Sequence, residues 1–451
     1  MPVAISRTVA LEVLQRIEEA DSYANLLLPK LLEKHRVDSR DSALAQELAF
    51  GSIRWKSTLE AIALSAAGRK PGDIDQPTMQ VLVLGGYQLL HTRVPVHAAI
   101  NESVEQAKSI GHGKTAGLVN AVLRKIAAKS WSEWLTELNR QCKSATEALA
   151  LQYAHPEWIV TALKLALSAD GRTQELEALL QADNEPASVN LVALPGLAEP
   201  ADSSSLEAHP SSPIGFVLDS GNPRDLEPVR AGRVRVQDAG SQLVALALVA
   251  TGEAKPGEKW LDLCAGPGGK SVLLASVAKS HGIELTCNEP SAHRAKLVRD
   301  ALKASNLPAK VIERDGRQIE SSFDRILVDA PCTGLGALRR RPEARWRKTA
   351  ADLRELTKLQ AELIDSAWSA LKPGGVLVYS TCSPHPSETT SIIEAALRRF
   401  GAQAQLQDAT KILQEVSPTL RLTEGRKTVQ LWPHRDDTDA MFVAIIRKSV
   451  S

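Results

Sequence analysis

The sequence predicts a helical N-terminal part and an α/β C-terminal part within one chain of 451 residues. In the first part, apolar side chains recur at helical spacing, and Val9, Val13 and Ile17 form one such stripe. In the second part, short apolar runs alternate with helical patterns. This alternation predicts a mostly parallel sheet with helices on both faces. We expect three domains: an all-helical bundle at 1–140, a small α+β connector at 145–232, and an α/β domain at 233–451.

The helical part carries further stripes at 43–50, 79–90 and 119–126. Pro95 suits the start of a helix that continues to Lys108. The connector is expected to hold helices at 155–170 and 174–182, strands at 187–193 and 216–218, and an exposed loop at 197–213.

The last domain contains seven candidate strands, which predict a seven-stranded sheet. They are residues 259–264, 283–289, 310–315, 323–330, 375–382, 429–433 and 442–447. Helical patterns occupy residues 271–280, 291–305, 352–371 and 387–400.

Composition indicates a soluble globular protein, with 43% hydrophobic and 24% charged residues. A net charge of +1 excludes a protein that is mostly nucleic-acid-binding surface, although it permits a local basic patch. The five cysteines are widely spaced, with no Cys-x-x-Cys pair and no zinc spacing. The sequence lacks a signal-peptide pattern, and its longest apolar run covers only 243–250. We expect a cytoplasmic protein that binds neither membrane nor metal.

The segment Trp260-Leu-Asp-Leu-Cys-Ala-Gly-Pro-Gly-Gly-Lys270 reads as a strand, a tight turn and a helix start. Nucleotide-like ligands bind at such turns, at the carboxyl ends of parallel strands. A P-loop would need glycine at position 264, which is Cys264. A dinucleotide fingerprint would need glycine at position 271, which is Ser271. Both common phosphate-binding motifs are therefore disfavoured.

Three acidic residues, Glu289, Asp315 and Asp329, end successive predicted strands. Because such strand ends converge on the crevice beside the glycine turn, Glu289 and Asp315 are placed to bond a ribose and an adenine edge. Cysteines follow the fourth and fifth predicted strands, in Asp329-Ala-Pro-Cys332 and Thr381-Cys382. A single cysteine there would be read as a small buried hydrophobe, whereas two at corresponding positions favour thiol chemistry.

A basic run, Arg339-Arg-Arg-Pro-Glu-Ala-Arg-Trp-Arg-Lys348, lies between the two cysteine motifs. Six of its ten residues are basic and one is acidic. This composition suits phosphate contacts and base stacking. The residues predicted to bind RNA are Arg339, Arg340, Arg341, Arg345 and Trp346.

Two resemblances extend this interpretation. Residues Val96-His-Ala-Ala-Ile-Asn-Glu-Ser-Val-Glu105 and Leu118-Val-Asn-Ala-Val-Leu-Arg-Lys125 resemble the NusB family of helical, RNA-binding antitermination factors. By that likeness, basic residues of the helical part could line a phosphate-contacting face. They are Arg7, Arg54, Lys56, Lys114, Arg124 and Lys125.

The glycine turn and the two cysteine motifs resemble those of RNA cytosine-C5 methyltransferases with a Rossmann-like domain that binds S-adenosylmethionine. Joined to the helical leader, they resemble the Sun/RsmB branch, which acts on 16S ribosomal RNA. Two positions depart from the commoner family pattern: Glu289 stands where Asp is more frequent, and Gly266 where Ala is.

The resemblance implies roles for individual residues. Cys382 would be the nucleophile and Cys332 would assist product release. Asp329 would bond the base, and Lys270 would orient it or Asp329. The residues implied to bind the cofactor are Cys264, Ala265, Gly266, Pro267, Gly268, Gly269, Lys270, Glu289, Arg294, Asp315 and Asp329.

The expected substrate is a structured hairpin of 16S rRNA or an assembly intermediate, bound by a monomer. The same chemistry on transfer RNA is an alternative, which the helical leader disfavours. A non-catalytic RNA-binding or antitermination factor is another, which the retained cysteines, Asp329 and Lys270 disfavour. Amino-group methylation is disfavoured because its Asn/Asp-Pro-Pro-aromatic motif is missing where Asp-Ala-Pro-Cys stands.

Overall fold

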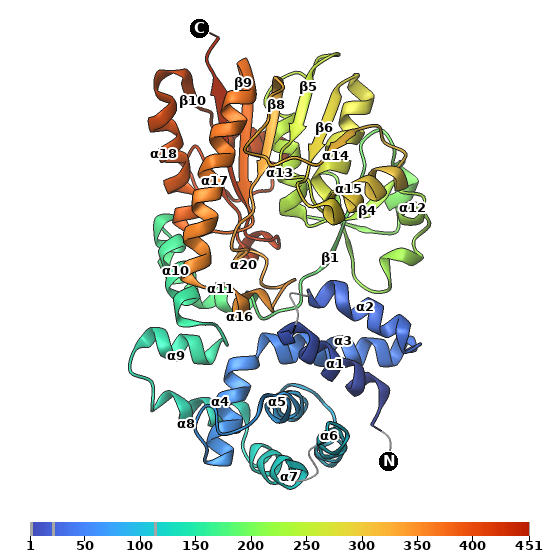
Figure 1. The fold of residues 1–451 in the computed structure, drawn as a ribbon, viewed down its shortest axis with the longest axis vertical. Helices are drawn as coiled ribbons and strands as arrows, with labels where there is room; N and C mark the ends of the chain where they lie inside the picture. The colour runs from blue at the N-terminus through green and yellow to red at the C-terminus, as the bar shows by residue number, and fades with distance from the viewer. Residues whose placement is uncertain (1–2, 20–22, 112–114, 451) are drawn as a thin grey trace. The chain divides into compact units, whose positions relative to one another are not determined.

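A computed structural model describes residues 3–19, 23–111 and 115–450, and its elements are drawn in Figure 1. These residues divide into two compact units. Unit 1 comprises Met1–Thr161, Asp183–Glu185 and Leu338–Arg347. Unit 2 comprises Ala162–Ala182, Pro186–Ala337 and Lys348–Ser451. The connector expected at 145–232 is divided between the two units and forms no unit of its own.

Unit 1 is helical, as predicted, and its described residues contain no strand. Its helices are α1 (Ile5–Glu19), α2 (Ala24–Lys34), α3 (Ser39–Arg54), α4 (Lys56–Ala67), α5 (Gln76–His91), α6 (Val96–Ser109), α7 (Thr115–Ile126), α8 (Trp131–Asn139), α9 (Ala145–Gln152), the first turn of α10 (Glu157–Ala169), and α16 (Ala344–Arg347). The stripe of Val9, Val13 and Ile17 is buried in one core with α5, α7 and their neighbours. Pro95 stands at the N-cap of α6, which confirms the helix start predicted there.

The segment Leu338–Arg347 leaves unit 2, contributes ten residues to unit 1, and returns at Lys348. Its anchor is Arg345, whose side chain is fully buried. The guanidinium donates to the carbonyl oxygens of Ala154 at 3.0 Å and Asp183 at 2.9 Å, and to Asn184 Oδ1 at 2.7 Å. Trp346 Nε1 donates to the carbonyl oxygen of Ile53 at 2.7 Å. Polar contacts of this kind fix the segment within the helical unit.

Most of the six basic residues noted in the helical part are engaged locally. Arg7 Nε donates to Gln88 at 2.8 Å, and Lys125 Nζ donates to the carbonyl oxygen of Ala66 at 2.9 Å. Arg54 is buried. Lys56 pairs with Glu18, Arg124 bonds Asn120, and Lys114 lies outside the described residues. These contacts give several of the basic residues a structural role within unit 1.

Unit 2 contains two sheets. The smaller, antiparallel sheet has the strand order β2-β3-β1-β4, with β1 (Val189–Ala193), β2 (Glu207–Ala208), β3 (Gly215–Leu218) and β4 (Val234–Val236). The larger sheet has the order β10-β12-β9-β8-β5-β6-β7, and β11 pairs with β12. Its strands are β5 (Lys259–Asp262), β6 (Glu284–Asn288), β7 (Lys310–Ile312), β8 (Phe323–Asp329), β9 (Leu371–Thr381), β10 (Ala404–Leu406), β11 (Val429–Gln430) and β12 (Phe442–Lys448).

The five strands β5 to β9 are parallel, and β12 runs antiparallel to β9. Successive side chains of these strands enter two different cores: Trp260 joins one and Leu261 the other. Helices α13 (Ala239–Val249), α14 (Gly269–His281), α15 (Ala292–Ala304) and α19 (Ala409–Val416) contribute to the first core. Helices α17 (Ala350–Ala370) and α18 (Thr390–Phe400) contribute to the second. The strands are therefore apolar on both faces, as parallel strands covered by helices must be.

The remaining helices of unit 2 are short or lie before the sheets. They are the rest of α10, α11 (Leu176–Ala182), α12 (Glu227–Arg230) and α20 (Pro433–Asp436). The larger sheet has eight strands where the sequence indicated seven. The additional strand is β10, whose three residues carry too short a pattern to be recognised. Strands β2 and β4 were also missed, because their two and three residues carry too short a pattern.

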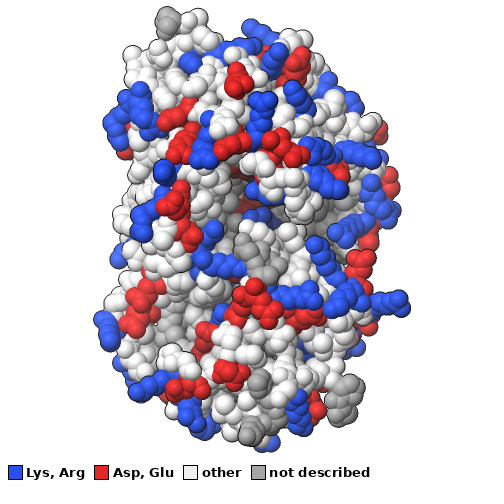
Figure 2. All heavy atoms as spheres, viewed as in Figure 1, with Lys and Arg blue, Asp and Glu red and all other residues white. Residues whose placement is uncertain are grey.

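On the face shown in Figure 2, Lys and Arg side chains lie among Asp and Glu side chains over most of the surface, in keeping with the net charge of +1. Over the described residues, no helix has the length and apolar character needed to cross a bilayer.

Replacing Arg345 with alanine is expected to lower the free energy of unfolding by about 3 kcal/mol or more, because buried carbonyl groups lose a charged donor. The matched control is Arg341→Ala in the same segment, where the side chain is exposed. That control should change stability by less than about 1 kcal/mol. Chemical denaturation followed by circular dichroism measures both, and equal stabilities would contradict the anchoring role.

Candidate active site

The glycine turn follows β5 and leads into α14. Gly268 stands at the helix N-cap with φ of +107°, a conformation that glycine adopts without strain. Ser271 Oγ donates to Asp262 Oδ2 at 2.6 Å, which ties the first turn of α14 to the end of β5. Burial raises the pKa of Asp262 to about 6, and the Ser271 hydrogen bond opposes that rise. Asp262 Oδ1 is buried and has no hydrogen-bond partner.

Glu289 lies beside the turn, as predicted from its place after a strand. The carboxylate is 3% exposed and accepts a hydrogen bond from Ser291 N at 3.0 Å. The Arg294 guanidinium lies 3.4 Å from Glu289 Oε2 and donates to the carbonyl oxygen of Gly266 at 2.6 Å. A Cβ atom on Gly266 would lie 2.3 Å from Glu289 Oε2. Glycine at position 266 therefore leaves room for the buried carboxylate.

The carboxylate of Asp315 is bound by a nearby arginine. Its carboxylate forms an ion pair of 2.6 Å with Arg317, and hydrogen bonds from Arg317 hold the pKa of Asp315 at about 2. The next residue, Gly316, packs near Leu263, so this segment passes over the start of the turn. Asp315 therefore lies near the glycine turn. Its carboxylate is half-exposed.

Asn288 is a structural element of the site that sequence reasoning missed. Its fully buried amide donates to the carbonyl oxygen of Leu263 at 3.1 Å and accepts from Arg314 N at 3.1 Å. One side chain thus joins the ends of three adjacent strands, β5, β6 and β7. Its place immediately before Glu289 is the one signal that could have drawn attention to it.

Asp329 and Lys270 meet at the end of β8. Lys270 Nζ lies 2.8 Å from Asp329 Oδ2, and Ser380 Oγ donates to Asp329 Oδ1 at 2.8 Å. Burial alone would lower the pKa of Lys270, but the Asp329 carboxylate outweighs it and the pKa is raised. The Cys382 sulfur also raises the pKa of Lys270. Lys270 is therefore held as a cation beside both a carboxylate and a thiol.

The two predicted cysteines come together. Cys332 Sγ and Cys382 Sγ lie 3.4 Å apart, although 50 residues separate them in the chain. The hydrogen bond to Cys382, burial and the nearby carboxylates Glu388 and Asp329 raise the pKa of Cys332 well above its usual value. Cys332 is accordingly held as a neutral thiol that can donate to the Cys382 sulfur.

Cys264 in the turn and Cys287 in β6 differ from this pair. Burial raises the pKa of each thiol well above its usual value. They behave as small apolar side chains packed in the cores of unit 2. In the part of the chain that the structure describes, no group of His, Cys, Asp and Glu could hold a metal ion.

The residues predicted to bind RNA fall in unit 1, where only Arg341 among them is exposed. Arg340 and Trp346 are half-buried. Arg339 and Arg345 are buried, so the expectation of an RNA-facing surface is corrected for these two. Arg345 binds backbone carbonyls of its own unit, as described above. The sequence shows that positive charges are dense in this segment. It does not show which of these side chains are buried and hydrogen-bonded within the helical unit.

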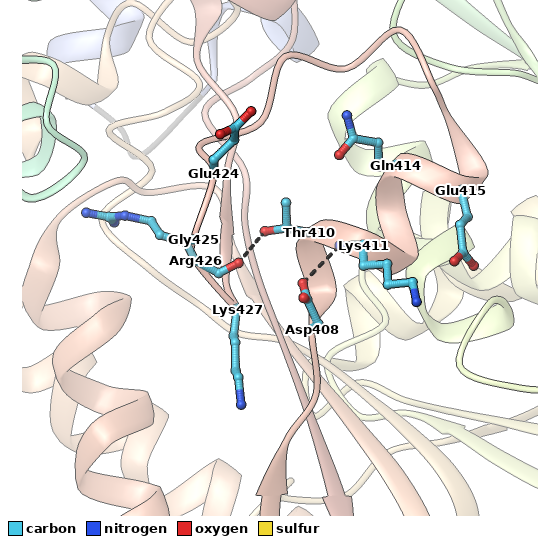
Figure 3. Close-up of a pocket in the computed structure, with 9 residues that line it drawn as sticks. All are labelled: Asp408, Thr410, Lys411, Gln414, Glu415, Glu424, Gly425, Arg426 and Lys427. Atoms are coloured by element: carbon cyan, nitrogen blue, oxygen red, sulfur yellow. Dashed lines mark hydrogen bonds between the residues drawn. The ribbon is translucent and has the colours of Figure 1, made fainter.

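A surface cavity of about 580 Å³ lies elsewhere in unit 2, beside α19 (Figure 3). Figure 3 shows Thr410 Oγ1 bonded to the carbonyl oxygen of Arg426, and Asp408 bonded to Lys411 N. None of the predicted site residues lines it. Its three cations and three anions balance, and we assign it no ligand.

Comparison with known proteins identifies the family. The model described as 16S rRNA methyltransferase RsmB/F matches residues 249–447, and the NusB family model matches residues 4–128. The ribosomal RNA small subunit methyltransferase B of Vibrio vulnificus is 32% identical over 98% of this chain and 99% of that protein. The chain belongs to the RsmB/F family of 16S rRNA methyltransferases.

A second relative in sequence and two solved structures are also similar to this chain. The Mycobacterium tuberculosis protein Rv1407, whose name assigns it to the methyltransferases, is 45% identical over 99% of this chain and 97% of that protein. The crystal structure of PH0851 superposes with a TM-score of 0.80 over 99% of this chain and 100% of that chain, at 21% identity. A methyltransferase homologue from Pyrococcus horikoshii superposes with a TM-score of 0.55 over 68% of this chain and 100% of that chain, at 22% identity. These two structures share the fold.

As a methyltransferase of the RsmB/F family, the enzyme uses S-adenosylmethionine as the methyl donor. The residues of the turn fit such a nucleoside cofactor. Gly266 and Gly268 allow close approach of a ligand to the backbone, the N-terminus of α14 offers N–H groups, and Asp262 Oδ1 is a buried acceptor without a partner. The buried carboxylate of Glu289 would accept hydrogen bonds from the sugar hydroxyl groups of the cofactor.

Gly268→Ala is expected to weaken S-adenosylmethionine binding about tenfold or more, since residue 268 has a φ of +107° and the new methyl group would lie 3.1 Å from Val298 Cα, so the turn must shift. Isothermal titration calorimetry with the purified enzyme measures this affinity. Gly117→Ala, at a glycine on α7 with open space around it, is the matched control and should bind like the wild type. Wild-type affinity in Gly268→Ala would contradict the role of this turn in cofactor binding.

Proposed function

We propose that this RsmB/F enzyme methylates carbon 5 of a cytosine in 16S rRNA through a transient bond between Cys382 and carbon 6 of the base. The observation that carries the proposal is the pair of sulfurs 3.4 Å apart, next to the Asp329–Lys270 ion pair. Carbon 5 of cytosine is a weak nucleophile, so methylation there requires prior activation of the ring. A thiol beside a base-binding carboxylate meets that requirement.

Cys382 is the proposed nucleophile. Its thiolate forms the S–C6 bond, and the electron pair of the C5–C6 double bond moves toward carbon 5, which becomes nucleophilic. The Lys270 ammonium lies where it favours the negative charge of the Cys382 sulfur before attack. S-adenosylmethionine, when bound, supplies the methyl group that carbon 5 accepts.

Asp329 is proposed to hold the base. Its two oxygens already accept hydrogen bonds from Lys270 and Ser380, which fix the carboxylate in one orientation. Each oxygen retains a lone pair that can accept from the exocyclic amino group of cytosine. Lys270 thus acts twice, as the partner of Asp329 and as the cation beside Cys382.

Cys332 is proposed to assist release of the product. The proton on carbon 5 must leave, its C–H electron pair restores the C5–C6 double bond, and the S–C6 bond breaks with its electrons returning to Cys382. A Cys332 thiolate, once formed, would accept that proton, and a sulfur with a raised pKa is the stronger base. The same raised pKa makes this thiolate scarce near neutral pH.

The proposed substrate is a structured segment of 16S rRNA or an assembly intermediate, acted on by a monomeric enzyme. A stacked cytosine cannot reach Cys382, so the target must lie in a loop or be flipped outward. The helical part that matches the NusB model, together with exposed Arg341, is proposed to provide RNA contacts. The same chemistry on transfer RNA is less well supported, since the full-length relatives from Vibrio vulnificus and Enterobacter carry small-subunit names.

Substitution of the two cysteines separates their roles. With RNA and S-adenosylmethionine, Cys332→Ala should accumulate a covalent protein–RNA band on a denaturing gel, because attack proceeds and release is blocked. Cys382→Ala should form no band and should lose methylation. A band that appears only in Cys382→Ala would exchange the two roles. Methylation that persists without any adduct in both variants would exclude the thiol mechanism.

Release should accelerate with pH, since deprotonation of Cys332 becomes easier as the pH approaches its raised pKa. We expect the decay rate of the wild-type adduct to rise about tenfold per pH unit between roughly pH 7 and 9. Rapid-quench, single-turnover experiments measure this decay. The slow decay of the Cys332→Ala adduct serves as the control and should show no such slope. A wild-type rate independent of pH would contradict the role of Cys332 as the base.

A further inference from the structure

Glu388 is a fully buried carboxylate in the short helical turn Pro386–Glu388, between β9 and α18. It stands six residues after Cys382, yet the sequence interpretation gave it no role beyond a helical position. A buried carboxylate is costly unless its oxygens are well bonded, so the partners of Glu388 indicate its purpose.

All the hydrogen bonds of the Glu388 carboxylate described here come from segments next to the reacting cysteines or from α17. Oε1 accepts from Thr333 N at 2.8 Å and from Gln360 Nε2 at 3.1 Å, and Oε2 accepts from the Thr333 hydroxyl group. Gln360 Nε2 also donates to the carbonyl oxygen of Pro331 at 2.9 Å. Glu388 and Gln360 therefore bond the residues on both sides of Cys332.

The same network reaches the second cysteine. Thr333 Oγ1 and Ser383 Oγ lie 3.1 Å apart, and Ser383 directly follows Cys382. Because the Thr333 hydroxyl hydrogen points to Glu388, the Ser383 hydroxyl group donates to Thr333. On the other side of the loop, Gly336 N donates to the carbonyl oxygen of Cys382 at 2.9 Å. The residues that follow each cysteine are thus joined to each other and to one carboxylate.

The sheet alone does not fix the two thiols. The pairing of β8 with β9 ends with Asp329 opposite Ser380, before either cysteine. Beyond that point the two loops leave their shared ladder, and they are joined by the Gly336–Cys382 backbone hydrogen bond and by side-chain contacts. Glu388 is the acceptor on which those contacts converge, and the Tyr379 hydroxyl group fixes its backbone by donating to the Glu388 carbonyl oxygen at 2.8 Å.

We infer that Glu388 is a positioning residue that sets the separation and orientation of Cys332 and Cys382. The inference rests on the proposed two-thiol mechanism for its consequence in catalysis. The effect of Glu388 on the separation and orientation of the two thiols can be measured without RNA or cofactor. Displacements near 1 Å at reacting groups can lower rates about a hundredfold, so loss of this carboxylate should affect turnover more than substrate binding.

The geometric readout is the rate at which the two thiols form a disulfide in dilute hydrogen peroxide. Each thiol loses one hydrogen, the sulfurs join, and the peroxide is reduced to two water molecules. Peptide mapping by mass spectrometry identifies the Cys332–Cys382 product among the five cysteines. Closely held sulfurs should form it readily in the wild type.

Glu388→Gln should slow this cross-linking about tenfold or more and lower kcat about ten- to hundredfold, with KM values for RNA and S-adenosylmethionine within about twofold. The matched control is Glu394→Gln, at an exposed glutamate on α18, which should behave like the wild type. Thermal unfolding of each variant shows whether the fold is kept.

A second pair of variants decides the question if Glu388→Gln fails to fold. Thr333→Val removes the hydroxyl group that links Glu388 to Ser383 and should slow both cross-linking and turnover, whereas Thr333→Ser keeps the hydroxyl group and should retain both. Unchanged cross-linking in the folded variants, or slower cross-linking with unchanged kcat, would overturn the inference. Slower cross-linking in Glu388→Gln, together with adduct results that reject the thiol mechanism, would refute the proposed function while leaving the positioning role intact.

Discussion

The Lys270 ammonium and the Asp329 carboxylate form an ion pair of 2.8 Å where the central strands of the larger sheet end. Lys270 belongs to the start of α14, Asp329 ends β8, and Ser380 on the adjacent β9 bonds the other carboxylate oxygen. Because β5 and β9 both pair with β8, residues separated by 59 and 51 positions become neighbours. The pair connects the glycine turn with the loops that carry the two cysteines.

Opposite electrostatic influences act on the two thiols. Lys270 is a cation near the Cys382 sulfur, whereas Cys332 is close to Asp329 and Glu388 and shares a hydrogen bond with Cys382. The negative neighbours oppose a second thiolate, and the pKa of Cys332 is raised. One site can therefore favour a thiolate at one sulfur and a proton at the other. This difference gives a physical basis for distinct roles in attack and release.

Local patterns predicted much of the site, because the turn around Gly268, the strand-end acid Glu289 and both cysteine loops are each continuous in sequence. Asn288, Ser380 and Glu388 were missed because their importance depends on partners that only the folded sheet brings near. Tertiary context likewise changed the interpretation of the basic run. The charge of Arg345 is visible in the sequence, but its burial follows from carbonyl groups more than 150 positions away. Short strands such as β10 carried too few residues for any periodicity.

Methylation of carbon 5 of cytosine, with Cys382 as the nucleophile, can be tested by identifying the methylated nucleoside. The most direct test is to treat unmodified 16S rRNA with the enzyme and S-adenosylmethionine, digest it to nucleosides, and identify the methylated product by chromatography and mass spectrometry against standards. We expect 5-methylcytidine with the wild-type enzyme and none with Cys382→Ser. Detection of N4-methylcytidine or a ribose-methylated nucleoside instead, or of 5-methylcytidine from Cys382→Ser, would contradict this expectation.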